Sequence, residues 1–251
     1  MADTLHYQLI KPEPELADFV ESFWLLHNEA TEDKEIVILP DGRIDLIFSQ
    51  SPAVPFRAIL LGLNTRPDQL LLQAQNRMFA ISFKLLAVEY MLKSTVADLL
   101  DNARQLPDGF WGFNVGDLQD FEGFCKKATQ QIRSLLPEET DERKRRLFEL
   151  IYAAQGEMPV KTLSEKVFWS SRQINRYCNQ QFGLSLKAYC DILRFRASFP
   201  HIKEGKLFPE KNFADQSHFI KAVKKLSGVL PKTLKQNTND RFIQFSTLSP
   251  E

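Results

Sequence analysis

Residues 162–183 read TLSEKVFWSSRQINRYCNQQFG, and this stretch decides the fold of the C-terminal half. Two segments in it have the form of a capping box, TLSE at 162–165 and SSRQ at 170–173. Such a segment marks the start of a helix, because the hydroxyl and the Glu or Gln side chain bond the first free backbone N–H groups. Two starts this close leave room for a first helix of about six residues. The pattern predicts two helices that meet at a tight turn, a helix-turn-helix unit.

The second predicted helix has a narrow apolar face and a polar one. Ile174, Cys178 and Phe182 lie four residues apart and are expected to be buried together. Gly183 suits the left-handed conformation that ends a helix. The polar side chains that would project together are Arg172, Asn175, Arg176 and Asn179. Arg can donate two hydrogen bonds to guanine, and Asn can pair with adenine. Taken alone, this face could equally be an ordinary solvated one.

Helices are also expected on both sides of this unit. Before it, residues 136–140 are predicted to form a linker. Thr140 is a candidate N-cap of the next helix, whose first turn contains Asp141 and Glu142. After it, Ser185 opens a helix that Pro200 should kink or end, because proline lacks the backbone N–H that a helix needs.

A second unit follows in the sequence NFADQSHFIK at 212–221. The helix that it predicts would bury Phe219, Val223 and Leu226 and would end at Gly228, and Pro231 suits the first turn of a closing helix. The side chains expected on its exposed face are Gln216, Ser217, Ile220, Lys221 and Lys224.

Charge separates the two halves of the 251-residue chain. Overall, 32 Lys and Arg balance 32 Asp and Glu. Residues 1–140 carry 12 basic and 21 acidic side chains, a net charge of −9, whereas 141–251 carry 20 basic and 11 acidic, a net charge of +9. Such an asymmetry is typical of a chain with a nucleic-acid-binding half. We therefore expect an acidic domain at 1–136 and a basic domain at 137–251.

The acidic half predicts mainly strands, because short β-branched or Phe-rich segments alternate with turn residues. The predicted strands are 34–39, 44–49, 56–62, 69–75 and 78–84, with Pro40-Asp41-Gly42 as a hairpin-type turn between the first two. A short helix is expected at 14–21. A long helix from about Asp117 would carry the apolar stripe Leu118, Phe121, Cys125, Ala128, Ile132 and Leu135. Packing of this stripe on its own domain is favoured over a dimer surface. The expected fold class is α+β, a β-rich N-terminal domain with flanking helices and an all-α C-terminal domain with two helix-turn-helix units.

Several residues carry a family resemblance. In the first unit they are Leu163, Ser170, Arg172, Ile174, Arg176, Gly183, Tyr189 and Arg194. In the second they are the run FADQSHF at 213–219, then Gly228, Val229 and Pro231. On these residues the chain from about 160 to 236 resembles the DNA-binding domain of AraC/XylS-family transcriptional regulators. The resemblance implies two recognition helices in successive major grooves, about 34 Å apart. The segment LPDGRIDL at 39–46 is also similar to the sensory half of some such regulators, which implies a domain that binds an effector, dimerises, or both.

The resemblance also implies roles for individual residues. The base-reading candidates are Arg172, Asn175 and Arg176 in the first unit and Gln216, Ser217 and Lys221 in the second. The phosphate-contacting candidates are Ser170, Asn179, His218, Lys224, Lys225 and Lys232. The implied partners are double-stranded DNA, a small-molecule effector, a second copy of the chain and RNA polymerase. The chain departs from the family where Pro200 interrupts the joining helix and where 206–210 replaces an alanine-rich helix, so base reading by the second unit stays open.

Patterns for catalysis are missing from the sequence. The histidines His6, His27, His201 and His218 have no metal-ligand spacing, and no GxSxG, GxGxxG or P-loop occurs. Asp41 and Asp45 could form an acid–base pair, but carboxylates beside a turn are far more often solvated caps. We therefore expect no enzyme, no catalytic residue, no metal and no cofactor.

The remaining features concern the compartment and the alternative function. Three cysteines without CxxC spacing, Cys125, Cys178 and Cys190, suggest buried thiols. The start lacks a secretory pattern, and no apolar run approaches the roughly 20 residues of a membrane helix, so a soluble, cytoplasmic protein is expected. The alternative to a regulator is a small-molecule-binding or enzymatic β-domain with a basic C-terminal module for protein or RNA.

Overall fold

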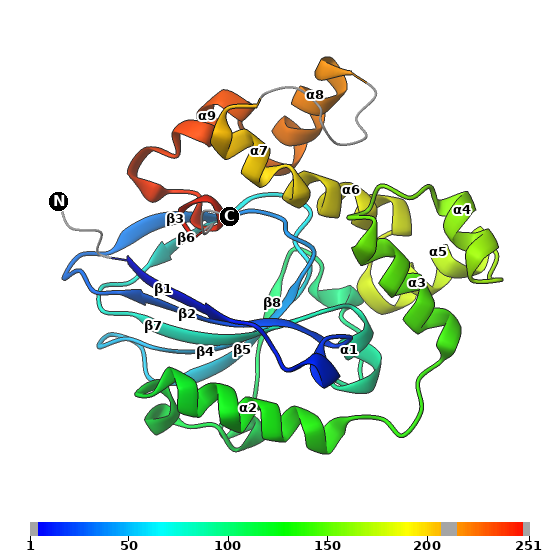
Figure 1. Ribbon diagram of the computed structural model, residues 1–251. Helices are drawn as coiled ribbons and strands as arrows, with labels where there is room; N and C mark the ends of the chain where they lie inside the picture. The colour runs from blue at the N-terminus through cyan, green and yellow to red at the C-terminus, as the bar shows by residue number, and fades with distance from the viewer. Residues whose placement is uncertain (1–4, 207–214, 248–251) are drawn as a thin grey trace.

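The computed structural model describes residues 5–206 and 215–247. Antiparallel sheets come first and a helical region follows, which confirms the predicted α+β class (Figure 1). Phe213 and Ala214 of the second motif, and most of the 206–210 segment, lie outside the described residues. Every helix in the described ranges is too short or too polar to cross a membrane.

Two antiparallel sheets form the N-terminal part. The larger has the strand order β1-β2-β7-β4-β5-β8, and the smaller pairs β3 with β6. The strands are β1 (Leu5–Ile10), β2 (Val20–Asn28), β3 (Lys34–Ile38), β4 (Ile44–Gln50), β5 (Arg57–Leu61), β6 (Asp68–Leu72), β7 (Arg77–Phe83) and β8 (Ala103–Gln105). The five predicted strands correspond to β3 to β7, with ends that differ by up to three residues.

Two expectations for this part were wrong. In place of a helix at 14–21 there is only the 3₁₀ turn η1 (Pro14–Leu16), and β2 begins at Val20. The reason is tertiary, because β2 lies between β1 and β7 and both of its edges are hydrogen-bonded. The turn at 40–42 does not form a hairpin either, since β3 pairs with β6 while β4 pairs with β5 and β7. It carries the chain from one sheet to the other.

Helix α2 (Phe121–Leu135) covers one face of the larger sheet (Figure 1). The Phe124 ring lies 5.7 Å from Phe48 and 5.4 Å from Phe79, centroid to centroid. Leu118 belongs to the preceding 3₁₀ helix η4 (Val115–Leu118) and is also buried. The predicted stripe therefore packs on its own sheet. The outer face of α2 is polar, with Lys126, Gln130, Arg133 and Ser134 exposed.

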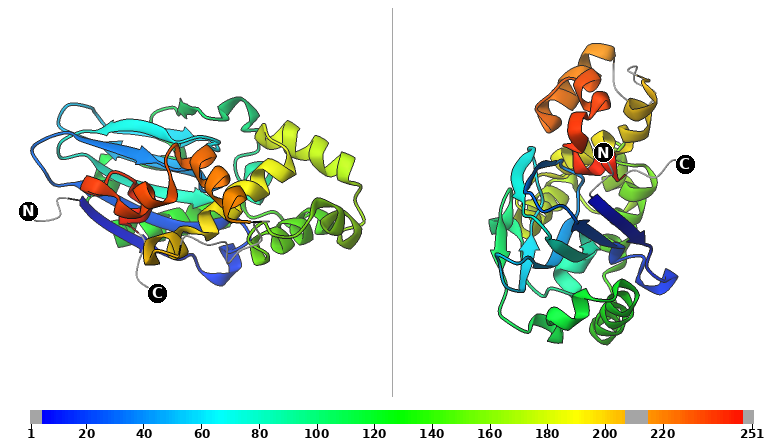
Figure 2. Two further views of the ribbon diagram at one scale, coloured as in Figure 1. Left: turned by 90° about the horizontal axis from the view of Figure 1, so that it is seen from above. Right: turned by 90° about the vertical axis from the view of Figure 1, so that its left-hand side faces the viewer.

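Short helices complete the β-rich part and form the rest of the chain. In the first part they are α1 (Leu86–Tyr90), η2 (Ala97–Leu99) and η3 (Phe110–Gly112). In the second they are α3 (Glu142–Ala153), α4 (Val160–Lys166), α5 (Ser171–Phe182), α6 (Leu186–Ala197), α7 (Phe199–Glu204), α8 (Gln216–Ser227), α9 (Pro231–Gln236), η5 (Thr238–Asp240) and α10 (Ile243–Ser246). Seen from above, α3 to α5 lie beyond the end of the larger sheet, and the last helices lie across it (Figure 2).

The helix starts agree with the prediction in part. Ser170 and Ser185 are N-caps as expected. Asp141 caps α3 in place of Thr140, because its carboxylate accepts from two backbone N–H groups and its charge suits the positive end of the helix dipole. Helix α4 begins after Pro159, so the predicted capping box at Thr162 lies inside the helix.

Replacing Phe124 with Ala should destabilise the protein by about 3–5 kcal/mol, because the cavity would open at the centre of a ring cluster. Urea denaturation followed by circular dichroism measures this. The control is Leu71→Ala, at a side chain that is 55% exposed on β6. Equal stability of the two variants would contradict the packing of α2 described above.

Candidate nucleic-acid interface

Helices α4 and α5 form the predicted helix-turn-helix unit. The Ser170 hydroxyl accepts from the backbone N–H of Gln173, and the Gln173 side chain accepts from the backbone N–H of Ser170. Ile174, Cys178 and Phe182 are all at most 2% exposed, as predicted. The helix ends at Gly183 with a φ of 80°. These contacts hold α5 by its apolar face and its two ends.

The opposite face of α5 carries two cations without an ion-pair partner among the described residues. Arg172 and Arg176 are exposed one turn apart, and within the described ranges neither guanidinium has an ion-pair partner. The other arginines between 141 and 200 all form ion pairs: Arg143, Arg145, Arg146, Arg194 and Arg196. Arg172 and Arg176 can therefore donate to a ligand without breaking an internal bond.

Asn175 lies differently from its two neighbours. It is half-buried, its Nδ2 donates to the Ser171 carbonyl at 3.0 Å, and its Oδ1 accepts from the Leu186 N–H at 3.1 Å. Pairing with adenine needs both the oxygen and the NH₂ group. To pair with adenine, Asn175 would have to break its hydrogen bonds to Ser171 and Leu186. As it stands, its side chain stabilises the turn between α5 and α6. Asn179 is exposed and donates to the Asn175 carbonyl at 2.7 Å.

Helix α8 carries the exposed residues of the second unit. Asp215 caps it by accepting from the His218 N–H at 2.7 Å, and Phe219, Val223 and Leu226 are buried as predicted. The exposed candidates are Gln216, Ser217, His218, Lys221, Lys224 and Lys225 on α8, and Lys232 on α9. Ile220, also expected to be exposed, is half-buried.

Helix α6 contacts both α5 and α8 (Figure 1). It ends at Ala197, and Pro200 stands in the first turn of α7, as expected for a residue that cannot continue a helix. The joining element is therefore two helices that meet at Ser198, whose hydroxyl donates to the Phe195 carbonyl at 2.6 Å.

The β-rich part holds α6 through the turn at 40–42. The Tyr189 hydroxyl donates to the Gly42 carbonyl at 3.0 Å. Gly42 has a φ of +77°, and a Cβ there would lie 2.9 Å from Leu193. Glycine is thus required twice at this place, by the backbone conformation and by the approach of α6.

A partly buried ion-pair cluster lies beside this contact. The Glu21 carboxylate on β2 bonds Arg43 at 3.0 Å and Arg196 of α6 at 3.1 Å. Lys84 and Lys11 lie 3.9 and 3.1 Å from the same carboxylate. Since Glu21 is shared by strands and by α6, its ion pairs join the two parts of the chain.

The C-terminal segment crosses back to the small sheet (Figure 1). The backbone N–H of Val37 donates to the Arg241 carbonyl at 2.7 Å, and Val37 forms a parallel bridge with Phe242. The side chain of Gln244 bonds both backbone groups of Leu39, at 2.9 and 3.0 Å. Residues 241–244 therefore tie the end of the helical part to β3 and to Leu39 after it.

The face of the larger sheet opposite α2 is partly apolar and partly polar. Ile47, Ile59 and Leu61 on it are only half-buried. Next to them the Asp45 carboxylate accepts from Trp24 Nε1 at 3.3 Å and from the Ser82 hydroxyl. Burial, and then the charge of Asp41, raises the pKa of Asp45 to about 6. Burial likewise raises the pKa of Asp41. Asp45 is therefore not the solvated cap that the sequence suggested, whereas Asp41 does cap its turn, because its carboxylate accepts from the Arg43 N–H at 3.1 Å.

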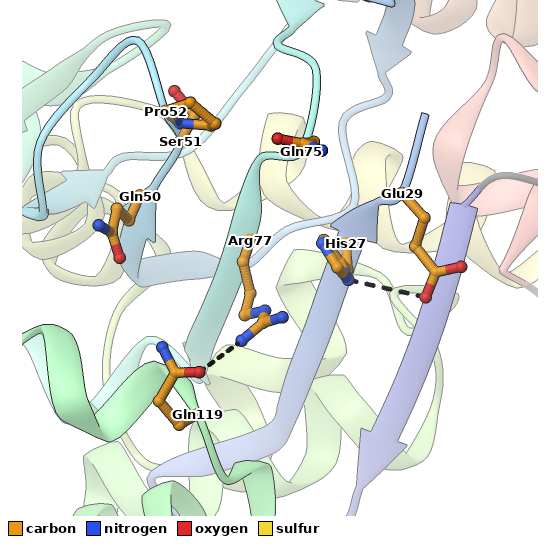
Figure 3. Close-up of a pocket in the computed structure, with 8 residues that line it drawn as sticks. All are labelled: His27, Glu29, Gln50, Ser51, Pro52, Gln75, Arg77 and Gln119. Atoms are coloured by element: carbon orange, nitrogen blue, oxygen red, sulfur yellow. Dashed lines mark hydrogen bonds and ion pairs between the residues drawn. The ribbon is translucent and has the colours of Figure 1, made fainter. Parts of the chain in front are cut away.

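A shallow open pocket of about 570 Å³ lies where β2 and β4 end and β7 begins, lined there by His27, Gln50 and Arg77 (Figure 3). Arg77 donates to Gln119 Oε1 at 3.1 Å, and His27 Nδ1 lies 3.7 Å from Glu29. Burial, and then the charge of Arg77, lowers the pKa of His27. Ser51 and His27 both line the pocket, but the Ser51 hydroxyl donates to Gln73 Oε1 at 2.6 Å and not to the imidazole. Across the described residues, no group of three or more His, Cys, Asp or Glu could hold a metal ion.

Asp45→Asn should stabilise the protein at neutral pH. The folded-state pKa of Asp45 lies above the unfolded value near 4, so its stabilising effect is full below pH 4 and is lost as pH rises through 6. The variant should gain on the wild type by up to about 3 kcal/mol between pH 4 and 7. Urea denaturation at several pH values measures the difference, and a difference that does not change with pH would contradict the burial of this carboxylate.

Gln244→Ala should loosen the contact between the tail and β3. Loss of two hydrogen bonds predicts about tenfold faster amide hydrogen exchange at Leu39 and Val37. The control is Gln236→Ala, at an exposed residue that ends α9, which should leave both amides unchanged. Unchanged exchange in Gln244→Ala would mean that the tail is held elsewhere.

Comparison with known proteins gives the following matches. Residues 8–105 match a family model described as a domain of unknown function, DUF6597. Among curated proteins, none matches the sequence. Similar solved structures include ToxT from Vibrio cholerae in a P21 crystal form, at 11% identity and a TM-score of 0.42, covering 93% of this chain and 98% of that chain. They also include wild-type ToxT of Vibrio cholerae strain SCE256 bound to an unsaturated fatty acid, at 10% identity and a TM-score of 0.40, covering 96% and 99%.

Proposed function

We propose that this protein is a sequence-specific regulator of transcription that binds double-stranded DNA. In this proposal 137–251 bind DNA, and 1–136 sense an effector or mediate dimerisation. The roles of individual residues rest on the side chains described above. The protein is not proposed to be an enzyme.

The main support for this proposal is a pair of arginines on α5. Arg172 and Arg176 are the only arginines between 141 and 200 without an ion pair in the described ranges, and they lie side by side on α5. Unpaired cations lose hydration energy when they are buried in an interface, and ion pairs with phosphates or hydrogen bonds to guanine O6 and N7 offset this loss. Because the N-terminal turns of a recognition helix enter the major groove, both side chains are suited to reach base edges.

The remaining candidates take narrower roles. Lys224, Lys225 and Lys232 are exposed and suited to contact phosphates, as are Asn179 and His218. Gln216 and Ser217 are exposed in the first turn of α8 and Lys221 is exposed further along the helix, which supports base reading by the second unit. Asn175 is proposed to position α5 and α6, and a base contact from it would need the turn to open.

Regulation is proposed to pass through the contacts between the two parts. The turn at 40–42, which follows β3, contacts α6 through Gly42 and Tyr189. The tail at 241–244 binds β3 and Leu39. An effector that binds the half-buried face around Trp24, Asp45 and Ile47 would displace neighbouring strands. Movement of β3 or of the turn would then change the position of α6 and, with it, the spacing of α5 and α8.

The test is a selection of bound duplexes from a random pool, followed by fluorescence anisotropy at fixed salt. The double variant Arg172→Ala/Arg176→Ala should lose specific affinity, at about 1–3 kcal/mol for each bidentate contact. It should keep the wild-type circular dichroism, because both side chains are exposed.

The matched control is Arg145→Ala/Arg146→Ala, which removes two exposed arginines from α3. It should weaken binding slightly and without regard to sequence. If the two double variants bind alike, α5 is not the recognition helix. If the wild type binds all duplexes equally, the basic half serves another partner, such as RNA or a protein.

A further inference from the structure

Phe168 is the most exposed large apolar side chain among the described residues. It lies in the turn between α4 and α5, and 91% of it is accessible to solvent, whereas the next most exposed, Leu71, is 55% accessible. Its φ of +50° places its backbone in the left-handed region, which glycine and asparagine tolerate and a bulky residue disfavours.

The neighbours of Phe168 leave it no other position. Val167 before it is 3% exposed, and its N–H donates to the Leu163 carbonyl at 3.1 Å. Trp169 after it packs on Tyr177 at 5.3 Å between ring centroids, and its N–H donates to the Ser164 carbonyl at 3.2 Å. The turn is thus fixed on both sides, and the phenyl ring is held in solvent.

A phenylalanine here is costly for folding in two ways. Its backbone conformation is strained, and its ring stays in water. Glycine would avoid both costs. Residues held in unfavourable conformations by well-packed neighbours are concentrated at functional positions, and an exposed apolar group is typical of a contact surface.

The charge around the ring identifies the kind of partner. Phe168 lies two residues before the N-cap of α5, and the exposed charged side chains near this turn in the chain are Lys161, Glu165, Lys166, Arg172 and Arg176. Four are cationic and one is anionic. A partner that fits this surface must be anionic and must also offer apolar patches. Duplex DNA has both, because the thymine methyl and the deoxyribose lie beside the phosphates in the major groove.

We propose that Phe168 is a DNA-contacting residue that packs on a thymine methyl and its deoxyribose at the edge of the bases that Arg172 reads. This inference rests on the proposed function, because it takes α5 as the recognition helix. It adds an apolar contact that the sequence pattern did not include. It also explains why a strained, exposed ring is kept where glycine would fold better.

The first experiment separates a binding role from a structural one. Phe168→Gly removes the ring and relieves the left-handed strain, so the variant should be at least as stable to urea as the wild type. Its affinity for the selected duplex should fall about tenfold, while the dependence of binding on salt stays the same, because no charge is lost. Leu71→Ala, at the exposed apolar side chain on β6, is the matched control and should bind as the wild type does.

The second experiment locates the contact on the DNA. Replacing the thymines of the selected duplex one at a time with deoxyuridine removes single methyl groups. At one position this should weaken binding by the wild type and leave binding by Phe168→Gly unchanged.

The outcomes distinguish the two proposals. If Phe168→Gly binds as tightly as a sequence-specific wild type, the role of Phe168 is wrong and the regulator function stands. A marked loss of stability in Phe168→Gly would make the residue structural. If the wild type prefers no duplex over another, the proposed function itself fails.

Discussion

The contact of α6 with the turn at 40–42 is the constraint on which the rest of the structure depends. A Cβ at Gly42 would lie 2.9 Å from Leu193 and 3.2 Å from the Tyr189 ring, so a side chain there would force one of them to shift. The Glu21 ion pairs lie beside the same contact. Helix α6 in turn contacts α5 and α8. A shift of the turn would therefore strain the packing of α6 against both candidate DNA-binding helices, since close-packed interiors have low compressibility.

Much of the first helix-turn-helix unit could be predicted from the sequence, because its signals are local. The capping box at Ser170, the spacing of Ile174 and Cys178, and Gly183 depend only on neighbours in the chain. The same holds for the stripe on α2. Local signals also misled where two candidates stood side by side, as with Thr140 and Asp141 at the start of α3.

The features that the sequence could not predict depend on distant residues. The helix expected at 14–21 shrinks to the turn η1, and its last two residues belong to β2, whose edges pair with β1 and β7. The role of the Pro-Asp-Gly turn required knowledge of α6, which lies about 150 residues later. Likewise, the amide of Asn175 looked free to pair with a base until Leu186 was placed beside it. Its half-buried position is set by the turn between two helices and by no periodicity.

One continuous apolar core extends through both parts of the chain, and this restricts how either part can be exchanged. Leu46 and Phe83 from the strands belong to the same buried cluster as Leu193 and Phe195 from α6. Either part expressed alone would expose to water the apolar surface that the other part now covers. Recombination that swapped one part for a foreign counterpart would meet the same obstacle, because the buried faces of the two parts have to fit each other.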